Sequence, residues 1–133
     1  MLWKYPDEDP IRLQPLVQAY VGDAVFELYV RSRLAAKGEK VNRLHRDAVD
    51  FVSAKAMAEY YRLLEPHLSP AERDVLRRGR NVKSRQIRSA GITQYHMSTG
   101  FEALVGYLFL SGQESRLERL LAILFDENEV SDV

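Results

Sequence analysis

Two carboxylates stand among apolar residues in this 133-residue sequence. Asp23 falls in the run YVGDAVF (20–26), and Glu102 falls in the run GFEALVG (100–106). A charge on an apolar helix face is costly unless a partner offsets it. Each carboxylate also has a glycine within one helical turn, Gly22 and Gly106, and glycine inside a helix costs about 1 kcal/mol relative to alanine. A close approach of two helix backbones is the expected compensation.

Two helices that meet at these glycines would bring the two carboxylates together. Paired carboxylates repel each other unless a proton or a cation lies between them, and hard oxygen ligands suit Mg²⁺. Glu27, one turn after Asp23, is either a further ligand or a solvent-facing residue. From composition and spacing alone, an alternative stays open: each acid bonds a local partner, such as Arg31 or a tyrosine.

A basic cluster follows in residues 73–88, which hold seven Lys and Arg residues against one acid, Asp74. Such a cluster is typical of a phosphate-binding surface, because arginine can meet two phosphate oxygens at once. The formal net charge of the whole chain is zero, so bulk charge does not hold a nucleic acid here. A solvated loop is the alternative interpretation. The residues expected to contact nucleic acid are Arg77, Arg78, Arg80, Asn81, Lys83, Ser84, Arg85 and Arg88.

Apolar periodicity predicts the helices that must position these residues. We expect helices over 13–37, 42–65, 70–79, from 95 or 98 to 110, and over 114–125, with a basic loop at 80–93. Asn42 and Ser69 are expected N-caps, Glu72 completes a capping box, and Gly38 and Gly79 are expected stops. No segment has the pattern of a strand. The sequence therefore predicts an all-α domain of about five main helices over 13–126, with an N-terminal segment (1–12) and an acidic C-terminal tail (127–133).

Several classes of function are excluded or disfavoured by composition. Without cysteine there is no disulfide, thiolate zinc site or cysteine nucleophile, which suits a cytoplasmic protein. The three histidines are too far apart to share a helix face, and neither a catalytic triad nor a glycine-rich phosphate loop is present. The longest apolar stretch (103–110) is too short to span a bilayer, and the acidic start lacks a signal sequence. We expect a cytoplasmic protein with no membrane partner.

The two acidic runs carry a resemblance to a known family. AYVGDAVFE (19–27) resembles the signature helix of the ribonuclease III catalytic domain, and FEALVGYLFL (101–110) resembles that domain's second acidic motif. VSAKA (52–56) and RRGRNVKS (77–84) are similar to segments of Mini-ribonuclease III, the short bacterial branch that has no double-stranded-RNA-binding domain. The likeness extends from about residue 13 to 125.

The resemblance implies an all-α homodimer that cuts both strands of duplex RNA with Mg²⁺. Asp23 and Glu102 match the family's metal-held catalytic acids. The larger enzymes have further acids where this chain has Leu16, Ala19 and Thr99. The metal would therefore have few protein ligands, and Glu27, Thr99 and Lys55 are the candidates to support it indirectly.

The branch also implies maturation of the 23S ribosomal RNA precursor, with a ribosomal protein or pre-ribosomal particle as a further kind of partner. One alternative is a non-catalytic RNA-binding module that kept the fold and lost the chemistry. Another is a helical protein-interaction domain with an incidental basic loop. Mg²⁺-dependent cleavage of duplex RNA distinguishes the enzyme from both.

Overall fold

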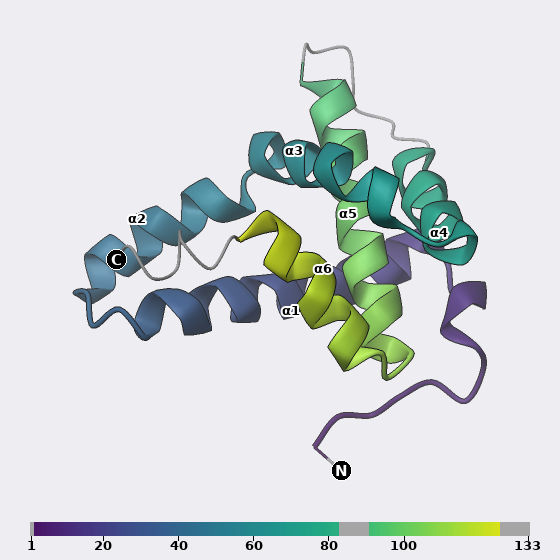
Figure 1. Cartoon of the computed structure of the whole chain (residues 1–133), viewed down its shortest axis with the longest axis horizontal. Coiled ribbons are helices and arrows are strands. Elements are labelled where there is room, and N and C mark those ends of the chain that lie inside the picture. The colour runs from purple at the N-terminus through teal and green to yellow at the C-terminus, as the bar shows by residue number, and fades with distance from the viewer. Residues whose placement is uncertain (1, 83–90, 126–133) are drawn as a thin grey trace.

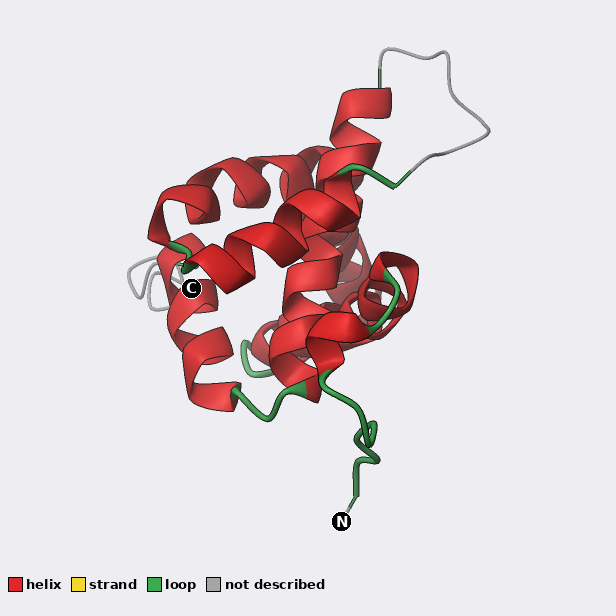
Figure 2. Cartoon of the chain, turned by 90° about the vertical axis from the view of Figure 1, so that its right-hand side faces the viewer, coloured by secondary structure: helices red, strands yellow, loops and turns green. Residues whose placement is uncertain are grey.

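A bundle of helices surrounds one central helix, α5 (Ile92–Leu110) (Figure 1). The computed structural model describes residues 2–82 and 91–125. Within these residues there is no strand (Figure 2), which confirms the all-α prediction. The other elements are η1 (Pro10–Arg12), α1 (Pro15–Ala35), α2 (Val41–Val52), α3 (Ala54–Leu64), η2 (Glu65–His67), α4 (Pro70–Arg80) and α6 (Glu114–Leu124).

The central position of α5 follows from its composition. Every residue from Met97 to Leu108 is buried except Glu102. A helix that is apolar on all sides must be covered on all sides, and α1, α3, α4 and α6 pack around it. A carboxylate in the middle of such a helix is therefore conspicuous.

The start of α4 agrees with the sequence prediction. Ser69 caps α4: its hydroxyl accepts the N–H of Glu72 at 3.2 Å, and the Glu72 carboxylate accepts the N–H of Ser69 at 2.8 Å. This is the predicted capping box, with Pro70 in the first helical position. The same Glu72 is buried and receives two bonds from Arg116, at 2.8 and 2.9 Å, so it also ties α4 to α6.

The predicted helix over 42–65 is wrong in its continuity. Ser53 is extended (φ −66°, ψ 154°) and its hydroxyl accepts the N–H of Ala56, so the chain ends α2 and caps α3 there. Asn42 is not the N-cap, because α2 begins at Val41 after Lys40. The apolar pattern continues through Ser53, which is why periodicity alone missed the break.

Two further boundaries also differ from the prediction. Gly79 does not stop α4, which continues to Arg80; a Cβ there would lie 2.8 Å from the Cα of Gly100, so Gly79 serves close packing against α5. Helix α5 starts at Ile92, earlier than expected. Of the predicted basic loop, residues 83–90 lie outside the described residues.

Three large apolar residues of α1 face outward. Leu16, Tyr20 and Leu28 belong to the apolar pattern that predicts the helix over 13–37, but they are 55%, 81% and 58% exposed and not part of the core. The core side of α1 is formed by Ala19, Gly22, Phe26, Val30 and Leu34. Leu16 and Tyr20 lie four residues apart and Leu28 lies eight residues further along, so the three make an apolar stripe along the outside of α1. Within the described residues, no helix is both long and apolar enough to cross a membrane.

Candidate active site

The site begins where the backbones of α1 and α5 touch. A Cβ on Gly22 would lie 1.7 Å from the carbonyl oxygen of Glu102, and a Cβ on Gly106 would lie 1.8 Å from that of Gln18. No side chain fits at either place, so glycine is required at both. The expected compensation for glycine within these helices is therefore present as a reciprocal backbone contact.

This crossing brings Asp23 and Glu102 side by side. Burial, a hydrogen bond with Asp23 and the charge of Asp23 together raise the pKa of Glu102 to about 8, and burial is the largest of these causes. The Glu102 carboxyl therefore holds a proton at neutral pH when no cation is present. Asp23 is exposed rather than buried on an apolar face, so the pair has one half-buried member and one open to solvent.

The other acidic and polar candidates add no further ligands to a metal site at Asp23 and Glu102. Glu27 forms an ion pair with Arg31 at 2.7 Å, so Arg31, which the sequence offered as a local partner for Asp23, bonds Glu27. Thr99 is buried, and its hydroxyl donates to the carbonyl oxygen of Tyr95 at 3.1 Å. Within the described residues, no group of three or more His, Cys, Asp or Glu side chains could hold a metal.

Lys55 belongs to a different part of the surface. It is exposed near the start of α3 and lines a hollow of about 450 Å³ with Asp50, Ser53 and Gln94 among others. Neither Asp23 nor Glu102 lines that hollow. The supporting role of Lys55 beside the carboxylates therefore stays a prediction.

The basic residues of α4 fall into distinct roles. Arg78 donates to the carbonyl oxygens of Ile11, at 2.9 Å, and Leu13, at 3.5 Å, and therefore anchors the N-terminal segment. These bonds give Arg78 a structural role, and its contact with RNA stays a prediction. Arg77 is exposed and bonds Glu65 at 3.3 Å. The predicted contacts Lys83, Ser84, Arg85 and Arg88 lie outside the described residues.

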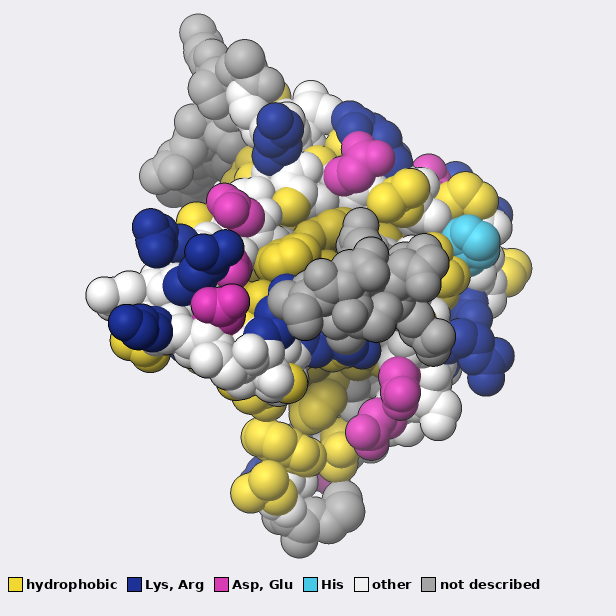
Figure 3. All heavy atoms as spheres, turned by 60° about the vertical axis from the view of Figure 1, so that its left-hand side comes forward, with side chains coloured by type: hydrophobic (Ala, Val, Ile, Leu, Met, Phe, Trp, Pro, Cys, Tyr) yellow, Lys and Arg dark blue, Asp and Glu magenta, His cyan; other side chains and the backbone are white. Residues whose placement is uncertain are grey.

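Arg80 and Asn81 stand at the end of α4. Arg80 donates to the hydroxyl of Tyr61 at 3.0 Å and to the side-chain oxygen of Asn81 at 3.2 Å. On another face of the molecule, shown in Figure 3, basic and acidic side chains alternate instead of gathering by sign. The ion pairs Arg31–Glu27 and Arg43–Asp47 illustrate how the charges on α1 and α2 are balanced within each helix.

Comparison with known proteins decides the family. The family model of the Ribonuclease III domain matches residues 16–113. A Mini-ribonuclease 3 of Symbiobacterium thermophilum is 48% identical over 120 residues, covering 89% of this chain and 92% of its own. The chain belongs to the ribonuclease III family. It is thus an endoribonuclease, and the resemblance seen in its two acidic motifs is confirmed.

Further relatives of the ribonuclease III family carry the same name. The Mini-ribonuclease 3 of a Thermoanaerobacter species is 44% identical over 118 residues, covering 87% of this chain and 83% of its own. That of Clostridium tetani is 37% identical over 131 residues, with coverages of 96% and 87%. The crystal structure of a Fusobacterium nucleatum protein shares the fold, with a TM-score of 0.82 and 24% identity over 91% of this chain and 99% of that one.

Sequence reasoning missed one polar cluster in this ribonuclease III domain. The ring of Tyr61 is buried in the core, and the residue is 2% exposed. Its hydroxyl nevertheless meets Arg80 beside a hollow that Thr93 and His96 also line. No spacing signal in the sequence links residues from three different helices, so only the tertiary structure reveals the cluster.

Proposed function

We propose that this endoribonuclease cuts double-stranded RNA in a Mg²⁺-dependent reaction, with Asp23 and Glu102 as the residues that hold the metal. The observation that carries the proposal is the carboxylate pair at the crossing of α1 and α5. The glycines at that crossing fix the pair, and the pKa of Glu102 is raised by its burial and, beyond that, by the neighbouring Asp23 carboxylate.

The donor set fits Mg²⁺. This ion takes oxygen ligands, keeps several of its waters and is bound by proteins through one or two carboxylates. A cation between Asp23 and Glu102 would replace the proton that Glu102 otherwise retains. Exposure of Asp23 leaves the site open to a large substrate. The bound ion would supply a water of lowered pKa for in-line attack and neutralise charge on the phosphate, giving 5′-phosphate and 3′-hydroxyl ends.

We propose further that the enzyme works as a homodimer, because two sites related by a twofold axis match the two strands of a duplex. The apolar stripe of Leu16, Tyr20 and Leu28 on α1 lies on the helix that carries Asp23 and supplies surface for such an interface. Sedimentation should give about twice the chain mass of 15.3 kDa. Leu28→Glu should shift the dimer toward monomer, whereas Val49→Glu on α2, also at an exposed apolar residue, should not. A wild-type monomer at micromolar concentration would contradict the proposal.

The substrate we propose is the 23S ribosomal RNA precursor, in the cytoplasm, alone or within a pre-ribosomal particle that includes ribosomal protein. Similarity to Mini-ribonuclease 3 proteins along the whole domain supports this choice. Duplex-forming precursor ends, transcribed in vitro, should be cut at discrete positions. Random degradation of such transcripts would argue for a different substrate.

The test of the proposed activity is a digest of a long duplex RNA and of each of its single strands, with Mg²⁺ and with a chelator. We expect cleavage of the duplex with Mg²⁺ and intact RNA in the other reactions. Equal cleavage of single strands, or cleavage in the chelator, would contradict it. Retention of the duplex in a gel without cleavage in Mg²⁺ would favour the non-catalytic RNA-binding alternative.

A further inference from the structure

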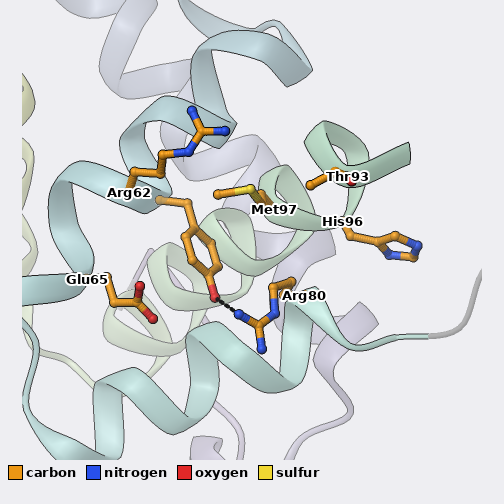
Figure 4. A pocket seen from close by; sticks show the side chains of 7 residues that line it. Arg62, Glu65, Arg80, Thr93, His96 and Met97 are labelled. Carbon is orange, nitrogen blue, oxygen red and sulfur yellow. Dashed lines mark hydrogen bonds between the residues drawn. The ribbon is translucent and has the colours of Figure 1, made fainter. Parts of the chain in front are cut away.

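A hollow of about 410 Å³ opens between α3, α4 and the start of α5 (Figure 4). It is lined by Tyr61, Arg62, Glu65, Arg80, Thr93, His96 and Met97. The buried side chains of Tyr61 and Met97 supply its apolar surface. Neither Asp23 nor Glu102 lines it, so the hollow is separate from the carboxylate pair.

Two hydrogen bonds to neutral groups hold the guanidinium of Arg80 in one direction. Its Nη1 donates to the Tyr61 hydroxyl, its Nε donates to Asn81, and both acceptors are neutral. Within the described part of the chain, no carboxylate forms an ion pair with Arg80. Its Nη2 donates to none of the described residues, so this edge of the guanidinium remains available to a ligand.

The other arginine at the rim provides a contrast. Arg62 pairs with Glu59 at 3.0 Å, and in Figure 4 its guanidinium is directed away from that of Arg80. Glu65, the acid at the rim, is paired with Arg77. Among the described residues that line this hollow, the unneutralised charge is therefore that of Arg80.

Tyr61 both fixes Arg80 and retains a donor. Burial raises the pKa of its phenol, so the group stays protonated at neutral pH. Because the oxygen accepts the bond from Arg80, the phenol proton is free to point to another acceptor. No described residue accepts that proton.

The first turns of α5 supply the opposite side. Thr93 and His96 project from α5 across from Glu65 (Figure 4), and each carries a hydrogen-bond donor. Gly91, the N-cap, has no side chain to satisfy the first N–H groups of the helix. The positive end of α5 adds to the preference for an anion at this place.

We propose that this hollow binds one phosphate of the RNA backbone, away from the scissile position. Arg80 makes the main contact, Thr93 and His96 add donors, and Tyr61 is the residue that positions Arg80. The inference rests on the proposed action on duplex RNA. A backbone contact of this kind suits an enzyme of duplex RNA, whose deep groove hides the base edges.

The test is the affinity for a duplex RNA oligonucleotide in a chelator, across a salt series, for variants of the full chain. Arg80→Gln should weaken binding about tenfold and flatten the log–log salt slope by roughly 0.7 to 0.9, the value for one phosphate contact. Tyr61→Phe keeps the ring and removes only the hydroxyl, and it should weaken binding about threefold. In the double variant the two losses should not add, because Tyr61 acts through Arg80.

Arg62→Gln is the matched control, because it removes the same charge from the rim of the same hollow. It should change affinity less than twofold. An equal loss in Arg62→Gln and Arg80→Gln would overturn the inference in favour of general charge attraction. Additive losses for Tyr61→Phe and Arg80→Gln would overturn the positioning role.

Two controls separate this inference from the proposed function. Denaturant unfolding of Tyr61→Phe checks that the fold is intact, and Thr93→Val with His96→Gln tests the same hollow through surface residues that do not support the core. The surface pair should weaken binding about threefold. A wild-type chain that neither binds nor cuts duplex RNA refutes the proposed function. A wild-type chain that does both, alongside hollow variants of unchanged affinity, refutes only the hollow.

Discussion

Replacing Glu102 by glutamine should make the metal-free protein less sensitive to pH. The folded chain keeps a proton on Glu102 up to about pH 8, whereas the unfolded chain loses it near 4.5. The unfolded state therefore binds fewer protons between these values, and wild-type stability falls as pH rises through that window. Below about pH 4.5 this loss is absent, and near pH 8 it is complete. Glu102→Gln removes the titrating group and with it the loss.

The size of the effect follows from the same interval. From 4.5 to about 8, at 1.36 kcal/mol per pH unit, the ceiling is about 5 kcal/mol. Asp23 is exposed and Glu102 is only half-buried, so solvent screens much of this. We expect Glu102→Gln to gain about 1–2 kcal/mol relative to wild type at pH 8 and almost nothing at pH 4.5.

The assay is urea unfolding in a chelator at several pH values and one protein concentration, so that any dimerisation is held constant. Glu118→Gln, at an exposed glutamate of α6, is the matched control and should show no comparable trend. If the difference in unfolding free energy between Glu102→Gln and wild type were the same at pH 5 and pH 8, the pKa of Glu102 would not be raised in the folded chain and the reasoning would fail.

Three further outcomes follow from particular contacts. Gly22→Ala should destabilise by more than about 3 kcal/mol in urea unfolding, because its Cβ would meet the Glu102 carbonyl oxygen, whereas Gly91→Ala has nothing within 4 Å and should be near neutral. Arg116→Ala should lower the free energy of unfolding by about 2 kcal/mol at pH 7, since it leaves the buried Glu72 without its arginine partner. Because Arg116 lowers the pKa of Glu72, this loss should shrink as pH falls below about 4.5. A loss that does not depend on pH would contradict this. Alanine at Arg77, Arg80, Lys83 and Arg85 should flatten the log–log salt slope of RNA binding by about 3. Arg78→Ala should instead lower stability and leave that slope unchanged. An unchanged slope in the quadruple variant would mean that the basic cluster has no role in RNA binding.

The crossing of α1 and α5 could be predicted from the sequence because glycine within a helix needs a compensating contact. Gly22 and Gly106 each stand beside a carboxylate motif, and their close approach was the simplest compensation. The central position of α5 was not predicted, although its apolar composition on either side of Glu102 accounts for it. These features depend on residue types within each helix, so they can be inferred from a single sequence.

What could not be predicted depends on tertiary partners. Helix α1 carries apolar residues on two faces, and nothing in its own sequence shows whether Ala19 or Tyr20 faces the core. Arg78 and Arg80 lie two residues apart with the same chemistry, yet one bonds backbone carbonyls of the N-terminal segment and the other a phenol on α3. The break between α2 and α3 at Ser53 was not predicted, because a capping serine within a periodic apolar pattern resembles an ordinary helical residue.

The central claim is that Asp23 and Glu102 hold the metal that this endoribonuclease requires. The most direct measurement is the single-turnover cleavage rate of a long duplex RNA against Mg²⁺ concentration for wild type, Asp23→Asn and Glu102→Gln. We predict at least about a 100-fold loss in both variants at saturating Mg²⁺, with RNA affinity in a chelator within about twofold of wild type because neither carboxylate lies in the basic segment. Cleavage by either variant at nearly the wild-type rate would contradict the claim for that residue.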